Sequence, residues 1–341
     1  MSDNYLLLGD EALALGALHS GLSGVYAYPG TPSTEITEFI QARKGYRGRG
    51  QALTYGEPPV HCNWSSNEKT AMEEALGASY AGKRALVCMK HVGMNVCADP
   101  FMGSAMTGAN GGLVVAACDD PSMHSSQNEQ DSRFYANFAM IPCLEPSDQQ
   151  ETYEAARYAF DLSEKYALPV LMRLTTRMAH SRANVHPREP RGQNPLHYPE
   201  GGKERRWVTL PVNARWRYPQ LIEDHAAAEK EAETSPFNKF TDGPDKSMGI
   251  IACGIAYNYL MENYPDGCPF PVLKISQYPF PRKLALELAR QCGTILVIEE
   301  GQCVVESMLA GVFPGGITVK GRLDGTLPRT GELDPDCVRK A

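Results

Sequence analysis

The sequence predicts an α/β fold in which a parallel sheet is covered by helices on both faces. The apolar runs at residues 84–89 and 113–118 lack the polar alternation of a half-exposed strand, which is typical of strands buried on both faces. Helical stretches at residues 68–81 and 149–166 separate these runs, and strands that alternate with helices indicate parallel pairing.

Each predicted element follows from local signals in the chain. Ser33 or Thr34 can cap the helix that follows the loop at 29–34, and residues 146–148 (PSD) precede the long helix at 149–166. The elements expected up to residue 182 are a helix at 9–20, strands at 25–28, 84–89, 113–118 and 168–173, and helices at 68–81, from about 99, and at 149–166.

The alternation stops near residue 184 and returns at residue 248. The intervening segment is rich in proline and charge, and residues 226–233 indicate only a short exposed helix. We therefore predict a larger domain at 1–183, a linker or surface excursion at 184–247, and a smaller α/β domain at 248–341. The smaller domain is expected to contain strands at 249–253, 272–275 and 294–299 and helices at 257–263, 282–291 and from 304.

Composition narrows the class of protein. The 341 residues suggest about two domains, and 43% hydrophobic residues fit a soluble globular chain rather than a disordered one. With 33 Lys+Arg against 40 Asp+Glu, the net charge of −7 argues against a nucleic-acid partner. No apolar run is long enough to span a bilayer, and the N-terminus has no signal-peptide features, so no membrane association is expected.

The ten cysteines form no C-x-x-C pair, which argues against a zinc ribbon or a ferredoxin-type cluster in this chain. Several of them lie in apolar runs, as buried free thiols do. We therefore expect a reducing, cytoplasmic environment. No motif predicts a metal ligand, and G-x-G-x-x-G, G-x-x-x-x-G-K-[ST] and G-x-S-x-G are absent.

The first candidate site motif is YPGTPSTEI at residues 28–36. A loop after a strand lies at the carboxyl edge of a parallel sheet, where open α/β folds bind ligands. Pro29 stiffens this loop, Gly30 permits close approach of a ligand, and Thr31 offers a hydroxyl. The alternative interpretation is a plain strand-to-helix turn with a Ser/Thr cap.

Three further segments contain chemically versatile residues. Glu68 begins a helix, where the helix dipole favours a carboxylate. The alternative interpretation is a surface charge at a helix start that has no further role. Lys90 and His91 follow the strand at 84–89, and a histidine there serves either proton transfer or structure. The polar residues at 119–133 make a plausible active-site or interface loop.

These motifs together resemble the thiamine-diphosphate-dependent 2-oxoacid:ferredoxin oxidoreductases, and within that family the alpha subunits that act on indolepyruvate. The resemblance is carried by YPGTPSTEI (28–36), KHVGMN (90–95), ADP (98–100), GGL (111–113), DDPSMHSSQNEQDSR (119–133), LEPSD (144–148) and PVLMRLTTR (169–177). It runs without a break through residues 5–182 and is looser from 248 to about 338.

The resemblance implies a thiamine-diphosphate-fold pyrimidine-binding domain followed by a transketolase C-terminal-like domain. In this family a glutamate shares a proton with N1′ of the cofactor's aminopyrimidine, and Glu68 matches its position. Thr31 matches a residue that faces the substrate carboxylate. The resemblance also implies cofactor-binding roles for Pro29, Gly30, His91, Gly93 and Asn95, and substrate-binding roles for Ser126 and Gln127, with Asp131 a weaker candidate in the same loop.

The chain departs from the family in one respect. No G-D-G motif is present, although the family's diphosphate-binding domain uses that motif to hold Mg²⁺ and the cofactor's phosphates. The resemblance therefore implies a subunit of a split enzyme, or a fragment. Mg²⁺, 4Fe-4S clusters and the diphosphate-binding domain are expected on partner chains, together with a gamma-type subunit, ferredoxin, coenzyme A and a 2-oxoacid.

The implied reaction is oxidative decarboxylation of an aryl pyruvate to an acyl-CoA. Two alternatives stay open at this stage. One is a subunit of a split, non-oxidative 2-oxoacid decarboxylase, against which the second domain counts. The other is a non-catalytic scaffold subunit that has kept the fold, against which the intact Thr31, Glu68 and Lys90–Asn95 argue.

Overall fold

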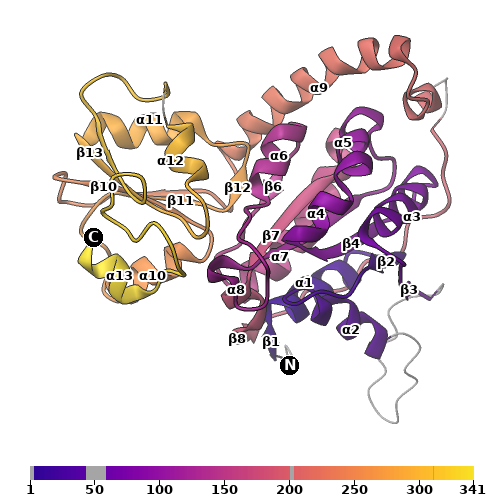
Figure 1. Cartoon of the computed structure of the whole chain (residues 1–341), viewed down its shortest axis with the longest axis horizontal. Coiled ribbons are helices and arrows are strands. Elements are labelled where there is room, and N and C mark those ends of the chain that lie inside the picture. Colours follow the sequence, from indigo (N-terminus) through magenta and orange to yellow (C-terminus); the bar gives the residue numbers. More distant parts are fainter. Residues whose placement is uncertain (1–3, 44–58, 200–202, 310) are drawn as a thin grey trace.

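The computed structural model describes residues 4–43, 59–199, 203–309 and 311–341. These residues form two lobes that lie side by side, each built around a mostly parallel sheet with helices packed against it (Figure 1). The α/β fold class predicted from the sequence is confirmed.

The larger sheet has seven strands in the order β12-β6-β7-β5-β4-β2-β3. All neighbouring strands are parallel except the β12–β6 pair. β5 is buried along its whole length, as expected for a central strand of a parallel sheet. The strands are β2 (Gly24–Ala27), β3 (His61–Trp64), β4 (Ala85–Lys90), β5 (Leu113–Asp119), β6 (Cys143–Leu144), β7 (Val170–Thr175) and β12 (Gln277–Tyr278).

Helices cover both faces of the larger sheet (Figure 1). One face is packed by α1 (Gly9–Leu18), α2 (Thr34–Arg43) and α7 (Gln149–Tyr166). The other is packed by α3 (Glu68–Tyr80), α4 (His91–Val96) and α5 (Ala98–Thr107). Side-chain caps explain where two of them begin, because Asn67 accepts from the Thr70 amide and Asp148 accepts from the Glu151 amide.

The smaller sheet has five strands in the order β14-β13-β10-β11-β9, parallel except for β9. Its strands are β9 (Lys239–Thr241), β10 (Gly249–Cys253), β11 (Val272–Ile275), β13 (Thr294–Ile298) and β14 (Thr318–Lys320). Its helices are α10 (Ala256–Glu262), α11 (Arg282–Gln291), α12 (Val304–Met308) and α13 (Pro335–Lys340).

Strand β12 joins the two lobes. It follows β11 of the smaller sheet by one residue, yet it pairs with β6 of the larger sheet through Gln277↔Leu144 and Tyr278↔Cys143. Two short helices lie on the larger lobe as well, α6 (Arg133–Ala139) and α8 (Thr176–His180), and β1 (Tyr5–Leu8) pairs with β8 (Arg182–Val185).

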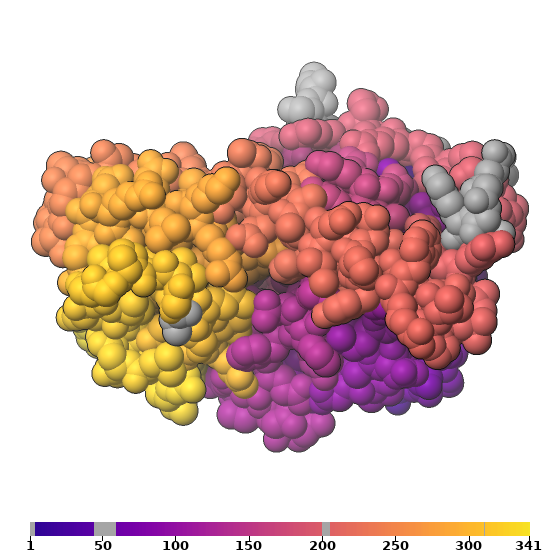
Figure 2. Space-filling model, turned by 90° about the horizontal axis from the view of Figure 1, so that it is seen from above, coloured from indigo at the N-terminus to yellow at the C-terminus, as the bar shows by residue number. Residues whose placement is uncertain are grey.

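The segment between the two regular regions contains a much longer helix than its sequence indicates. The predicted helix at 226–233 was too short, because α9 runs from Pro211 to Ala232. Pro211 lies in the first turn of α9, where proline is well tolerated. Pro219 lies inside the helix, and a proline at such a position usually indicates that a helix ends there. Figure 2 shows this salmon-coloured stretch lying across the upper face of the larger lobe, where α9 packs on α5.

All ten cysteines are free thiols, and eight of them are buried, which confirms the prediction of buried free cysteines. Among the helices that the structure describes, none combines the length and the apolar character needed to cross a membrane.

Candidate cofactor and substrate site

Four segments meet at the carboxyl edge of the larger sheet. Strands β3, β2, β4 and β5 are consecutive neighbours in that sheet and run parallel. The residues that follow them therefore emerge side by side: 65–67, 28–33, 91 onward and 120–132. This edge is where open α/β sheets bind ligands, and it collects the motifs singled out in the sequence.

Glu68 is the first residue of α3 and is only 8% exposed. Its side chain lies against Gly93 of α4, where an added Cβ would come within 2.7 Å of the Glu68 Cγ and 2.8 Å of its Oε1. Burial, and to a lesser degree the charge of Glu68, raise the pKa of the Cys97 thiol to about 12. No hydrogen bond of a described residue reaches the Glu68 carboxylate, and its oxygens are not among the fully buried unpartnered atoms, so a ligand can reach them.

The YPGTPSTEI loop is held by its own hydroxyls. The Gly30 amide donates to Thr34 Oγ1 at 3.0 Å, and the Ser33 hydroxyl donates to the Gly30 carbonyl at 2.7 Å. Pro29 and Thr31 are exposed on this loop. The loop is thus rigid in its backbone while the Thr31 side chain faces outward.

Lys90 connects this loop to the loop after β5. Its aliphatic stem crosses Gly30, where an added Cβ would lie 3.1 Å from the Lys90 Cδ. Its ammonium donates to the Ser125 carbonyl at 3.1 Å, and the Ser125 hydroxyl donates to the Thr31 carbonyl at 3.4 Å. Any side chain at position 30 would displace the lysine stem by a few tenths of an ångström.

His91 and Asn95 lie on α4, which begins directly at the end of β4, so the expected loop at this place is in fact a short helix. His91 is buried, and its Nε2 lies 3.0 Å from the Asn128 carbonyl, while its Nδ1 has no hydrogen-bond partner. Asn95 is exposed and accepts a hydrogen bond from the Tyr135 hydroxyl. His91 therefore joins α4 to the loop after β5.

The loop after β5 is organised by Asp120, which sequence reasoning missed. Its Oδ2 accepts from the Ser125 amide at 2.8 Å and the Ser126 hydroxyl at 2.7 Å, and its Oδ1 accepts from the Thr176 hydroxyl at 2.7 Å. Burial alone would raise the pKa of Asp120, but these hydrogen bonds outweigh it and lower the pKa. Gln127 is exposed at the tip. The Ser126 hydroxyl is thus engaged within the loop, and Gln127 faces solvent.

Asp131, a weaker candidate for the same loop, lies elsewhere. It is buried and pairs with Arg133 at 2.6 Å and with Arg173 at 3.2 Å. These residues belong to an ion network between the two sheets, made of Asp119, Asp131, Arg133, Glu145, Arg173 and Glu299. The Glu300–Arg322 pair adjoins this network, because Arg133 and Arg173 donate to the Glu300 carbonyl. Asp131 therefore has a structural role at the junction.

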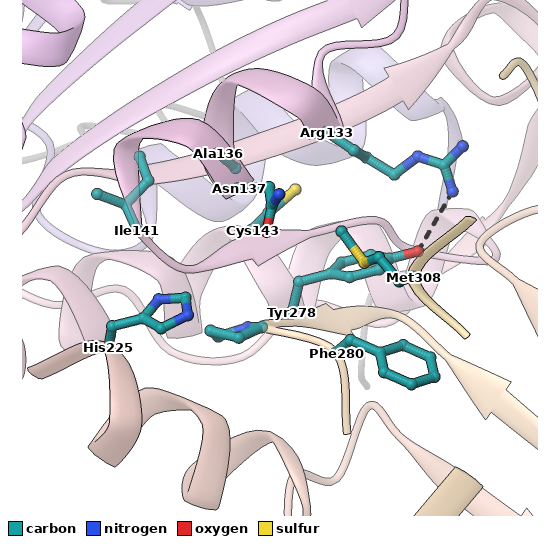
Figure 3. Close-up of a pocket in the computed structure, with 10 residues that line it drawn as sticks. Arg133, Ala136, Asn137, Ile141, Cys143, His225, Tyr278, Phe280 and Met308 are labelled. Atoms are coloured by element: carbon teal, nitrogen blue, oxygen red, sulfur yellow. Dashed lines mark hydrogen bonds between the residues drawn. The ribbon is translucent and has the colours of Figure 1, made fainter. Parts of the chain in front are cut away.

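A pocket at the same junction is lined by α6, β12 and residues of α9 and α12 (Figure 3). Figure 3 shows Arg133 pointing toward the Tyr278 hydroxyl, to which it donates at 3.4 Å, with His225 and Phe280 on the opposite wall. None of the predicted site residues lines this pocket. It is a separate feature from the strand-end site.

Comparison with known proteins agrees with this geometry. The family model for the thiamine-diphosphate-binding region of pyruvate flavodoxin/ferredoxin oxidoreductases matches residues 15–234. The chain belongs to this family of oxidoreductases, and the resemblance inferred from its motifs is confirmed.

Individual relatives agree with this family membership. The indolepyruvate oxidoreductase subunit IorA of Methanothermobacter thermautotrophicus is 41% identical, over 99% of this chain and 54% of that protein. The Archaeoglobus fulgidus protein of the same name is 39% identical, over 97% of this chain and 52% of that protein. The chain thus spans about half the length of the relatives it matches.

Solved structures share the fold at low identity. A 2-oxoglutarate:ferredoxin oxidoreductase from Magnetococcus marinus matches with a TM-score of 0.75 and 16% identity, over 99% of this chain and 64% of that one. A split-gene transketolase matches with a TM-score of 0.53 and 16% identity, over 92% of this chain and 86% of that one. The likeness covers both lobes.

The residues at the strand-end site fit a thiamine pyrimidine. The carboxylate of Glu68 is buried, faces a glycine and has no hydrogen-bond donor among the described residues, and the buried His91 Nδ1 has no partner. A flat heteroaromatic ring with ring nitrogens and an amino group offers the donors that such a surface requires. A glycine beside a carboxylate leaves room for that ring.

Proposed function

We propose that this chain is the pyrimidine-binding subunit of a thiamine-diphosphate-dependent 2-oxoacid:ferredoxin oxidoreductase that converts aryl pyruvates to acyl-CoA. The observation that carries the proposal is the position of the Glu68 side chain. It is 8% exposed, lies against Gly93 and accepts no hydrogen bond from a described residue. The preference for an aryl pyruvate rests on the relatives named indolepyruvate oxidoreductase subunit.

In this proposal Glu68 is the catalytic residue of the chain. Its carboxylate holds the cofactor's pyrimidine and exchanges a proton with it, which is the work of a general acid–base residue. Thiamine diphosphate supplies a nucleophilic carbon and an electron sink when it is bound. Pro29, Gly30, His91, Gly93 and Asn95 are the further cofactor-binding residues.

Thr31 is proposed to bind the substrate carboxylate, with Ser126 and Gln127 at the rim. Lys90 supports this arrangement, because its contacts with Gly30 and Ser125 hold the two loops together. The rigid backbone of the 28–34 loop gives the Thr31 hydroxyl a fixed position, which is what substrate positioning requires.

The proposal assigns the remaining components to partner chains. These are the diphosphate-binding domain with its Mg²⁺, the 4Fe-4S clusters, a gamma-type subunit, ferredoxin and coenzyme A, in a cytoplasmic complex. The division at 1–183, 184–247 and 248–341 belongs to the same proposal, with the first part binding the pyrimidine and the last packing against subunits.

The test is reconstitution with a chain that carries the diphosphate-binding domain and the clusters. Reduction of a viologen dye is measured with indolepyruvate, phenylpyruvate and 2-oxoglutarate. We expect Glu68→Gln to lower turnover by at least about a hundredfold, because a glutamine cannot exchange the proton. Glu73→Gln, on the exposed side of the same helix, is the matched control and should be active.

Three results would contradict all or part of the proposal. Near-wild-type turnover of Glu68→Gln would remove the catalytic role. Release of CO₂ without an electron acceptor would favour the non-oxidative decarboxylase instead. Preference for 2-oxoglutarate over the aryl pyruvates would reject the substrate assignment alone.

A further inference from the structure

Three potential metal ligands meet beneath the YPGTPSTEI loop. Asp10 is the second residue of α1, Glu35 the second residue of α2, and His180 the last residue of α8. One ligand atom from each lies within 4.8 Å of the other two. Helix α1 contacts both α2 and α8, so the three positions are fixed by packing rather than by flexible loops (Figure 1).

Two of the carboxylate oxygens in this cluster lack a partner. Asp10 Oδ1 accepts from the Cys118 thiol at 3.9 Å, and Glu35 Oε1 lies 3.6 Å from His180 Nε2. The other oxygens, Asp10 Oδ2 and Glu35 Oε2, are buried without a hydrogen-bond partner. A native fold rarely leaves two adjacent buried carboxylate oxygens unsatisfied, so these oxygens indicate an absent positive group.

The charge around Asp10 points the same way. Asp10 is fully buried, and the carboxylates of Glu35 and Glu11 add negative charge around it. The helix N-termini beside the acids supply only about half a positive charge each. Buried carboxylates are stable when they are paired or when they coordinate a metal.

We propose that Asp10, Glu35 and His180 bind a divalent first-row transition-metal ion, such as Zn²⁺ or Mn²⁺. An imidazole combined with carboxylates is typical of these ions, whereas Mg²⁺ and Ca²⁺ prefer oxygen ligands alone. Ligand atoms about 2.1 Å from an ion lie roughly 3–4 Å from one another. The three side chains, whose ligand atoms lie within 4.8 Å of one another, would therefore move together by up to about an ångström when the ion binds. The side chains of Glu35 and His180, 35% and 34% exposed, can make that movement and leave an entry path and room for water.

The bound ion has a positioning role. It ties the first turn of α2 to α1 and α8, and Thr34, which caps the substrate loop at Gly30, directly precedes Glu35. Metal binding therefore fixes the loop that presents Thr31. The inference does not depend on the proposed function, because its test measures metal content and thermal stability rather than turnover.

The experiment uses the full 341-residue chain, stripped with a chelator and then loaded with Zn²⁺ or Mn²⁺ alone. Elemental analysis after gel filtration should give one ion per chain, and the ion should raise Tm. Asp10→Asn, which is nearly isosteric, and His180→Gln, at the surface, should each weaken binding by at least about tenfold. Glu38→Gln and His186→Gln, exposed nearby on the chain, are the matched controls.

Two outcomes would overturn the proposal. Wild-type chain that binds neither ion would show that Asp10 and Glu35 share a proton instead of a metal. Equal binding by wild type, Asp10→Asn and His180→Gln would place the ion elsewhere. Because His180→Gln alters a partly exposed side chain, its result stands even if Asp10→Asn fails to fold.

Discussion

The junction between the sheets and the strand-end site treat polar groups in opposite ways. At the junction, Arg173 is fully buried and pairs with Asp119, Asp131 and Glu145. At the strand-end site, the Glu68 carboxylate has no hydrogen-bond donor among the described residues, and His91 Nδ1 has no partner. The junction thus pairs most of its buried charges, with Asp119 Oδ1 as an exception, and paired buried charges hold the lobes together, whereas unpaired polar groups at a site are available to a ligand.

Removing the central cation of the junction should have the largest effect. Arg173→Met leaves three carboxylates without their shared partner, and breaking a buried pair costs about 3–5 kcal/mol. Chemical denaturation measures the loss. Arg177→Met is the matched control, because that arginine is 41% exposed and its bridge to Glu332 is worth at most about 1 kcal/mol. Equal losses of unfolding free energy in the two variants would show that the buried network stabilises the fold no more than the exposed bridge does.

A methyl group at Gly93 should break the strand-end site without unfolding the chain. Its Cβ would come within 2.7 Å of the Glu68 Cγ, and the displaced carboxylate should lower turnover of the reconstituted enzyme about ten- to a hundredfold. Gly103→Ala in α5, where nothing lies within 4 Å, is the control and should retain activity. Full activity of Gly93→Ala would remove the argument that this glycine makes room for the cofactor.

The junction carries more acid than base, and Glu300 shows the consequence. Burial, opposed by Arg322, raises its pKa to about 7 from a usual 4.5. The folded chain thus holds a proton that the unfolded chain releases, and the stability from this group, complete below pH 4.5, is lost as pH rises through about 7.

Glu300→Gln should therefore be more stable than wild type by about 1–3 kcal/mol at pH 8 and nearly equal to it at pH 4.5. Unfolding free energies at the two pH values test this, with Glu262→Gln, exposed on α10, as the control. A difference that does not grow with pH would contradict the raised pKa.

The smallest expected effect is a gain in the stability of the folded chain. Gly77 lies inside α3 with nothing within 4 Å of its missing Cβ, so Gly77→Ala should stabilise the chain by about 0.5–1 kcal/mol. Differential scanning calorimetry measures it. A loss of stability would mean that α3 has a close neighbour that the described residues lack.

The sequence predicted regular elements well where local signals decide them. The fully buried β5 and the strand at 249–253 form where they were expected, and the capped α7 spans residues 149–166 as predicted. The sequence-based prediction was wrong at α9. Pro219 indicates the end of a helix, but buried side chains such as Leu221 pack against the larger lobe and keep the helix continuous. Tertiary packing overrode the local signal.

The site was predictable only in part. Local spacing placed Glu68 at a helix start, and the family resemblance supplied its role. The contact of Glu68 with Gly93, the hydrogen bonds of Asp120 and the pairing of Arg173 with Asp119 join elements that are distant in the sequence. Such pairs depend on the order of strands, which no local pattern contains.

The crossing of β12 into the larger sheet bears on how the chain can be divided. The two lobes share main-chain hydrogen bonds through Gln277 and Tyr278, so neither is a self-contained unit of expression or of recombination. A truncation after residue 247 would leave β6 as a bare edge strand, and such edges promote aggregation. A biochemist who wishes to isolate the larger lobe should therefore keep residues 277–278 with it.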